Sequence, residues 1–338
     1  MTHSPPDANS GKRSQFMIGG KGVGGEEVCP PSRPGKGNPV LMLTNELAGR
    51  TERETVRAIV DELGVTDVEV VESSAQSDLD DYLDRRAGRT LVVVGGDGSL
   101  HTVLAALWRR GEAADCTVGL VPLGTGNDFA RGVGIPLDPR EAARLIPGGR
   151  AQPVDLVTDD AGGVVVNAMH VGVGADAAEQ ARPLKPHLGT AAFPIGAVLA
   201  GVRAPGWRLR VEVDGRPVAD GRRRVLMAGL SNAPTIAGGM AVLAPEASVI
   251  DGLFDVTVSH AVGPVARVAY ALKLRRGTHT SRADVIHSLA RTLTISGQPF
   301  QVNADGEISG PFRRRTWTIQ PGAWRCILPE PQDLNLVG

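Results

Sequence analysis

Residues 90–99 read TLVVVGGDGS, in which five aliphatic or β-branched residues lead directly into a turn with three glycines. An uninterrupted run of this kind is typical of a parallel strand that is covered on both faces. The helical pattern that follows, residues 99–110, places Val103, Leu104 and Leu107 on one side. The turn at 95–98 therefore lies where the carboxyl end of a strand meets the start of a helix, which is where open α/β sheets bind ligands.

The flanking segments repeat this alternation of strand and helix. Thr51 and Glu54 have the spacing of a capping box, which predicts that a helix begins there. Further elements are predicted as strands at 40–44, 65–71 and 117–121 and as helices after Ser77 and from Asp138 to Gly148. This order predicts a parallel α/β domain over residues 39–150. The glycine- and proline-rich residues 1–38 are expected to form a disordered tail.

Beyond residue 150 the pattern changes to short strands. These are predicted at 154–157, 164–171, 209–213, 225–230, 253–258, 293–296, 300–303, 316–320 and 325–328, with helical segments at 190–202 and 264–275. Asp214-Gly215 is a two-residue hairpin signal. Residues 151–330 are therefore predicted to form an antiparallel β-sandwich, followed by a short tail at 331–338.

Composition excludes several classes of function. The formal net charge of the 338 residues is -1, without the basic excess of a nucleic-acid binder, so no nucleic acid is expected as a partner. The three cysteines and seven histidines show no metal-site spacing. No signal peptide is evident, and the longest uncharged run, 190–202, is too short for a transmembrane helix of about 20 apolar residues. A cytoplasmic protein is expected.

A second glycine-rich loop, Pro122–Asp128, follows the predicted strand at 117–121. Glycines let backbone N–H groups approach phosphate oxygens, and a helix start adds partial positive charge. Ser99 and Thr125 offer hydroxyl donors, whereas Asp97 and Asp128 suit Mg²⁺. Each loop alone could be an ordinary tight turn, but two together favour a nucleotide site. Neither is a Walker A loop, and the glycines at 19–25 have no strand before them.

The two loops, GGDGSLHT at 95–102 and PLGTGNDFAR at 122–131, resemble the catalytic domain of diacylglycerol kinases and bacterial lipid kinases. Sphingosine kinases are related to that family, and NAD kinases more distantly. The resemblance covers residues 40–329. It includes further motifs at Asn45–Gly49, Ser73–Asp78, Gly238–Met240, Ala244–Ala247, Asp251–Asp255, Asp305–Glu307 and Pro321–Trp324.

The resemblance implies an ATP- and Mg²⁺-dependent kinase that phosphorylates a lipid hydroxyl, with diacylglycerol as the first expectation, at a membrane surface that it contacts peripherally. It implies that the nucleotide is bound by Asn45, Gly49, Ser73, Gly95, Gly96, Asp97, Gly98, Ser99, His101, Thr102, Gly124, Thr125, Gly126, Asn127 and Asp128. Glu307 would be the catalytic base, and Asp97 would join the reactive metal and water network. Asp251, with the carbonyls of Ser248 and Leu253, would hold a Mg²⁺ outside the reaction centre. Without the resemblance, Asp305-Gly306-Glu307 would be interpreted as a hairpin turn.

Several positions depart from the family pattern. Glu46 stands where the family has proline, Ser99 where it has threonine, and His101-Thr102 where it has Asn-Glu. These changes are expected to weaken ATP binding without abolishing it. Ala75 and Ser77 blur the segment that makes Ser73 a candidate.

Other interpretations stay open. The acceptor could be another lipid, such as a sphingoid base, or a soluble alcohol such as NAD; the chain could also be a nucleotide-binding regulator without catalysis, or a structural protein. The residues that could line a lipid groove or simply belong to the core are Phe193, Ile195, Val198 and Leu199. The arginine clusters that could meet anionic headgroups, or simply face solvent, are at 222–224, 275–276 and 313–315. A homodimer is left open.

Overall fold

The computed structural model describes residues 39–45, 50–73, 76–172 and 206–329, all of which belong to one compact unit that spans residues 31–338. The predicted tails and the predicted helix at 190–202 lie outside the described residues. None of the helices in the described ranges is long and apolar enough to span a membrane.

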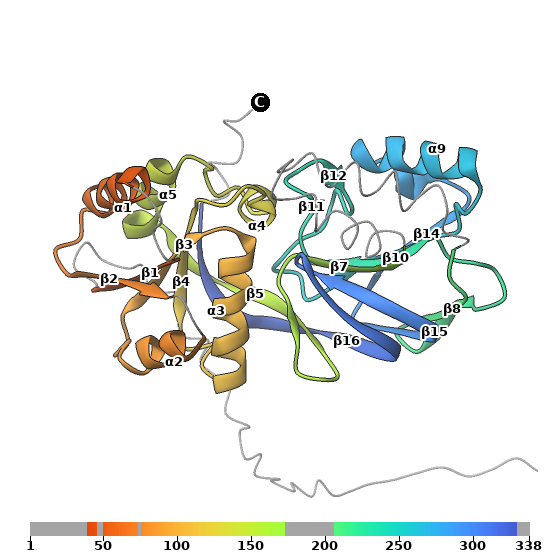
Figure 1. Cartoon of the computed structure of the whole chain (residues 1–338), viewed down its shortest axis with the longest axis horizontal. Helices are drawn as coiled ribbons and strands as arrows, with labels where there is room; N and C mark the ends of the chain where they lie inside the picture. Colours follow the sequence, from red (N-terminus) through yellow and green to blue (C-terminus); the bar gives the residue numbers. More distant parts are fainter. Residues whose placement is uncertain (1–38, 46–49, 74–75, 173–205, 330–338) are drawn as a thin grey trace, which may run out of the picture. The chain divides into compact units, whose positions relative to one another are not determined.

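Four parallel strands form the sheet of the first half, in the spatial order β2 (Val68–Ser73), β1 (Val40–Asn45), β3 (Thr90–Gly95) and β4 (Thr117–Pro122). The helices α1 (Arg50–Leu63) and α5 (Pro139–Gly148) lie on one face, and α2 (Gln76–Asp84) and α3 (Asp97–Arg110) lie on the other (Figure 1). Because helices cover both faces, every residue of β3 is buried. The predicted parallel α/β half is confirmed.

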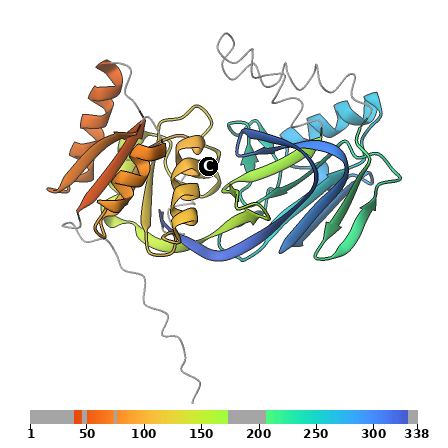
Figure 2. The same cartoon turned by 60° about the horizontal axis from the view of Figure 1, so that its bottom comes forward.

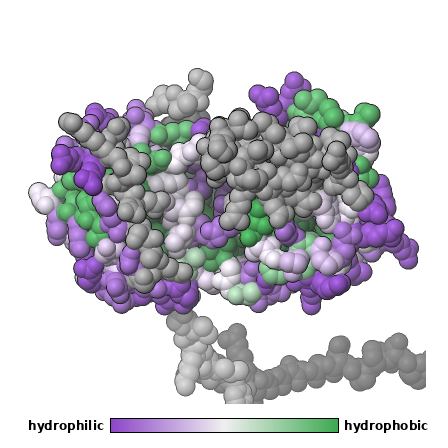
Figure 3. All heavy atoms as spheres, viewed as in Figure 1, coloured by the Kyte–Doolittle hydropathy of each residue, from purple (hydrophilic) through white to green (hydrophobic). Residues whose placement is uncertain are grey.

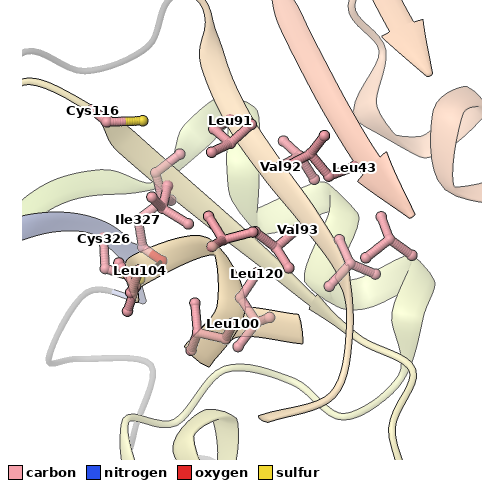
Figure 4. Close-up of a cluster of buried hydrophobic side chains, with 14 of the residues drawn as sticks. Leu43, Leu91, Val92, Val93, Leu100, Leu104, Cys116, Leu120, Cys326 and Ile327 are labelled. Atoms are coloured by element: carbon pink, nitrogen blue, oxygen red, sulfur yellow. Dashed lines mark hydrogen bonds between the residues drawn. The ribbon is translucent and has the colours of Figure 1, made fainter. Parts of the chain in front are cut away.

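The core of this half is built from the aliphatic runs that predicted its strands. Leu91 and Val93 of β3 meet Leu100 and Leu104 of α3 in one buried cluster (Figure 4). The helix α5 begins as predicted, because the side chain of Asp138 accepts hydrogen bonds from the backbone N–H groups of residues 140 and 141. The side chain of Thr51, half of the predicted capping box, lies outside the described residues.

The second half is antiparallel. Its strands and helices are β5 (Arg150–Asp159), β6 (Val164–Val165), β7 (Ala168–Gly172), β8 (Leu209–Val213), β9 (Arg216–Asp220), β10 (Met227–Ser231), β11 (Thr235–Ile236), β12 (Ala241–Val242), β13 (Phe254–Ser259), α9 (Pro264–Arg275), η2 (His279–Ser281), β14 (Val285–Ala290), β15 (Thr292–Ala304) and β16 (Glu307–Leu328). The strands pair in the order β14-β13-β10-β7-β15-β16, while β8 and β9 continue from β15. The predicted sandwich and the Asp214-Gly215 hairpin between β8 and β9 are confirmed.

The last strand, β16, connects the two halves. It pairs with β15 and β5 in antiparallel fashion, and Arg325 and Cys326 near its end pair in parallel with β4 (Figure 2). The two strands predicted at 316–320 and 325–328 are parts of this one strand, with a register shift between Gln320 and Trp324. The predicted limits of the domains remain a prediction.

One predicted strand is divided. Residues 164–171 were expected to be continuous, but β6 and β7 are separated at Val166 and Asn167. The physical reason is that the backbone N–H groups of residues 166–168 donate to the carboxylate of Asp305 instead of continuing a regular ladder. A mostly apolar run cannot reveal such a competing acceptor, because Asp305 lies 137 to 139 positions further along the chain.

Candidate active site

The predicted nucleotide residues of the first half lie along one edge of the sheet. Asn45 ends β1, Ser73 ends β2 and pairs with Asn45, and Gly95 ends β3. Since the strands are parallel, all of their carboxyl ends meet at this edge. Only the backbone of Asn45 and Ser73 is described, and Gly49 lies outside the described residues.

The two glycine-rich loops touch each other through their backbones. Gly95 pairs with Pro122, and the N–H of Leu123 donates to the carbonyl of Gly95 at 2.9 Å. A Cβ added to Gly124 would lie 2.5 Å from the Cα of Gly96, and one added to Gly96 would lie 2.9 Å from the Cα of Gly124. Real Cβ atoms do not approach so closely, so both positions require glycine.

Asp97 ties the first loop to the second. Its two carboxylate oxygens accept the backbone N–H groups of Asp128 and Phe129, each at 3.0 Å, at the start of α4 (Asp128–Gly132). Burial raises the pKa of the Asp97 carboxyl above its ordinary value, although these two hydrogen bonds lower it. Each oxygen keeps lone pairs for a cation or a water molecule.

Asp128 connects the second loop to the other half of the chain. Its carboxylate accepts the backbone N–H groups of Gly238 and Gly239, both at 2.8 Å, in the turn between β11 and β12. Asn127 adopts a left-handed conformation (φ 53°) and donates from Nδ2 to the carbonyl of Gly124 at 2.8 Å. Its Oδ1 is buried without a hydrogen-bond partner and lies against the glycine pair, 2.8 Å from the position of a Cβ at Gly124.

The hydroxyl residues of the loops are placed differently from one another. The Oγ1 of Thr102 donates to the carbonyl of Gly98 at 2.9 Å, within its own helix. Ser99 lies over the first glycine, since a Cβ at Gly95 would be 2.4 Å from its Oγ. Thr125 is exposed at the tip of the second loop. The loops thus offer an exposed hydroxyl at Thr125, while that of Thr102 is engaged.

His101 of α3 lies between two acidic side chains of the second half. Its Nδ1 is 2.9 Å from Oδ2 of Asp305, and its Nε2 is 3.8 Å from Oε2 of Glu307. The side chain of Asp305 is 1% exposed and also accepts the N–H groups of residues 166–168, at 2.7 to 3.0 Å. Because Asp305 is an acceptor throughout, Nδ1 of His101 is the donor, and Nε2 faces Glu307.

The charge state of His101 follows from these neighbours. Burial lowers the pKa of His101, but the hydrogen bond and charge of Asp305 and the charge of Glu307 outweigh it and raise the pKa above its ordinary value. Glu307 itself is 67% exposed, so its carboxylate is accessible to a substrate. These three side chains therefore form a row: the buried acceptor Asp305 contacts His101, and His101 faces the accessible carboxylate of Glu307.

The predicted Mg²⁺ loop lies before β13. Oδ1 of Asp251 accepts the N–H of Leu253 at 3.0 Å, and Oγ of Ser248 accepts the N–H of Ile250 at 3.4 Å. Within the described ranges, no group of three or more His, Cys, Asp or Glu side chains is placed to hold a metal ion. A site at this loop would depend on the Asp251 carboxylate together with backbone carbonyls.

The sequence motifs did not identify Asp155, whose carboxylate holds this loop by a backbone hydrogen bond. Its carboxylate accepts the N–H groups of Gly252 and Gly322, each at 2.7 Å, and it is 2% exposed. Burial raises the pKa of Asp155, although these two hydrogen bonds lower it. An isolated aspartate inside the apolar run Val154–Val157 was the available signal, since such residues are buried only with partners.

Comparisons with known proteins match both halves. Residues 39–158 match the family model of the diacylglycerol kinase catalytic domain, and residues 167–328 match that of the YegS C-terminal NAD kinase beta sandwich-like domain. A protein of Xanthomonas oryzae pv. oryzae with the name "Probable lipid kinase YegS-like" is 33% identical over 261 residues, which cover 74% of this chain and 81% of that protein. The chain belongs to the YegS-like family of diacylglycerol kinase relatives.

Other members of the YegS-like family agree with this assignment. A protein with the same name from Xanthomonas euvesicatoria pv. vesicatoria is 37% identical over 261 residues, covering 74% of this chain and 81% of its own. A crystal structure of a "putative diacylglycerol kinase" from Bacillus anthracis has a TM-score of 0.69 at 21% identity, covering 87% of this chain and 98% of that chain. At this identity the structural likeness establishes the fold.

Proposed function

We propose that this member of the YegS-like family transfers the γ-phosphate of ATP to the hydroxyl of a lipid, with diacylglycerol as the acceptor and phosphatidic acid as the product. The observation that carries the proposal is the contact between the two glycine-rich loops at the carboxyl-end edge of the parallel sheet. At the same edge, α3 presents His101, which lies next to Glu307. Lipid kinase is also the activity in the names of the relatives. A cytoplasmic enzyme at the inner membrane face would meet both ATP and lipid.

The glycine-rich loops are suited to phosphates. The absence of side chains at Gly96 and Gly124 leaves backbone N–H groups approachable, and the N-terminus of α3 adds partial positive charge. Thr125 would donate its exposed hydroxyl to the nucleotide. The remaining lone pairs of Asp97 fit a Mg²⁺ ion or its water shell. Bound Mg²⁺ would neutralise phosphate charge; Asp251, with the carbonyls of Ser248 and Leu253, is the proposed second site.

Glu307 is the proposed base. Its carboxylate takes the proton of the lipid hydroxyl as that oxygen attacks the γ-phosphorus, and the bond to the leaving ADP oxygen breaks. A base for this step has to be ionised and accessible. The imidazole of His101, held by Asp305, faces this carboxylate, with Nε2 of His101 3.8 Å from Oε2 of Glu307. His101 is thus a positioning residue for the proposed base.

The test is transfer of label from γ-labelled ATP to diacylglycerol in mixed micelles with Mg²⁺, compared among wild type, Glu307→Gln and Glu141→Gln. Glu141 is an exposed glutamate in the first turn of α5 and serves as the matched control. We expect a loss of about 100-fold or more in kcat for the first variant and full activity for the second. Transfer that survives in Glu307→Gln would reject this base. Activity on sphingoid bases or NAD alone would reject diacylglycerol, and a wild type inert on all acceptors would favour a regulator.

A further inference from the structure

The outward face of α9 carries an apolar stripe. The inner face of this helix packs Tyr270, which is 4% exposed, against a small cluster with Leu243 and Ala261. On the opposite face, Val265 is 83% exposed, Val268 62% and Leu272 58%. Positions three and four apart lie on one side of a helix, so these three side chains form a continuous stripe. Figure 3 shows hydrophobic atoms gathered at the upper right, where α9 lies in Figure 1.

Such a face is unusual for a helix that covers a globular core. A helix of this kind turns one apolar face inward and presents polar side chains to solvent. Here the inward face is satisfied by Tyr270 and its neighbours, yet the large aliphatic side chains on the outside remain exposed. A contiguous exposed apolar patch marks a surface that contacts another phase or molecule.

The charge around the stripe selects the partner. Residues 260–276 contain no aspartate or glutamate, and the exposed Arg275 and Arg276 directly follow the stripe at the C-terminal end of α9. Basic residues beside an exposed apolar helix face complement the anionic headgroups of a membrane. A second copy of the chain is a weaker match, because a stable protein interface takes roughly 20–30 residues on each side.

We infer that the outward face of α9 docks onto an anionic membrane surface, with Val265, Val268 and Leu272 entering the headgroup region and the two arginines contacting lipid phosphates. The inference rests on the proposed function, since a lipid acceptor is presented by a bilayer. An enzyme that approaches its acceptor from water gains local concentration from such a contact. The same face explains why exposed aliphatic residues and basic residues occur together on one short helix.

The test is cosedimentation of the full chain with vesicles of phosphatidylcholine and phosphatidylglycerol, measured without ATP. Three variants are compared with wild type: Val265→Ser/Val268→Ser/Leu272→Ser, Arg275→Gln/Arg276→Gln, and a control that removes charge elsewhere, Arg53→Gln/Arg57→Gln on α1. We expect binding to fall about tenfold or more in the first, since full burial of even one aliphatic side chain is worth about that factor. The second is expected to lose about fivefold for each arginine. The control, at two exposed positions of a helix in the other half of the chain, is expected to bind as wild type does.

A second apolar control is Val70→Ser, because Val70 is 41% exposed on β2 in the other half of the chain. Unchanged binding in the α9 variants, equal losses in both controls, or no binding of wild type to these vesicles would each overturn the inference. Dissociation of a dimer by the triple variant in sedimentation velocity would overturn it in favour of a second copy. Because binding is measured without nucleotide, its outcome is independent of whether the protein transfers phosphate.

Discussion

Asp305→Asn tests how much the buried carboxylate contributes to joining the two halves. The carboxylate accepts three backbone N–H groups, from Val166, Asn167 and Ala168, and the Nδ1 of His101. Asparagine has the same shape but one acceptor oxygen. If this oxygen keeps the Asn167 and Ala168 donors, the amide NH₂ points at the N–H of Val166, which loses its acceptor, and at Nδ1 of His101, which accepts in its other neutral tautomer.

The expected loss follows from the N–H of Val166. A buried donor left unsatisfied costs about 1–3 kcal/mol. Backbone strain does not confuse the result: residue 305 has φ 49°, a left-handed conformation that asparagine adopts readily. A loss of this size is a large share of the roughly 5–15 kcal/mol that stabilises a folded domain.

The assay is urea unfolding, with hydrogen exchange of the backbone amides of residues 166–168 as the local readout. Asp214→Asn is the matched control, because Asp214 also has a positive φ (47°) and accepts backbone N–H groups, from Arg291 and Thr292, but at an exposed hairpin. Water replaces the lost bonds there, so we expect a loss below about 1 kcal/mol. Equal losses in both variants, or unchanged exchange at 166–168, would refute the reasoning.

Two further predictions concern the glycine-rich loops and the histidine beside them. Gly124→Ala should abolish ATP binding, measured by calorimetry, and destabilise the chain, because its Cβ would lie 2.5 Å from the backbone of Gly96. Gly148→Ala is the control, because a Cβ there meets nothing within 4 Å. Wild-type ATP affinity in Gly124→Ala would contradict the proposed phosphate-binding role of the loops. The pKa of His101 is raised in the folded state, so its stabilising contribution is complete below the ordinary value of about 6.5 and is lost as pH rises through the folded pKa. The stability difference between wild type and His101→Gln should therefore shrink from pH 6 to pH 8 in urea unfolding, and a difference that grows over this range would disprove the pairing.

Much of the fold was predictable because it depends on residue patterns that are local in the sequence. The apolar run before Gly95 specifies a buried parallel strand, and Asp138-Pro139 specifies a helix start, since each depends on residues close in the chain. The division of the strand at 164–171 was not predictable. It depends on an acceptor, Asp305, that lies 137 to 139 positions away from the donating amides.

The candidate site shows the same limit. Sequence motifs predicted that the two loops lie at one sheet edge, and they do. They did not predict that the carboxylate of Asp128 accepts hydrogen bonds from the backbone of Gly238 and Gly239. Nor did they predict that His101 pairs with Asp305 and faces Glu307. From the sequence, histidine at position 101 in place of the family's asparagine was expected to weaken ATP binding. In the structure, its side chain has a hydrogen-bond partner, Asp305, in the second half of the chain.

The sequence by itself determined the two classes of architecture and the glycine positions where backbones come close, because side-chain periodicity and the conformational freedom of glycine are local properties. Only the tertiary structure decided what the acidic residues do. Asp97, Asp128, Asp155 and Asp305 each accept backbone N–H groups of a segment that is distant in the sequence, from 31 to 167 positions away. The physical reason is that a buried carboxylate has to find donors wherever folding brings unpaired amides together, and that choice is made by packing.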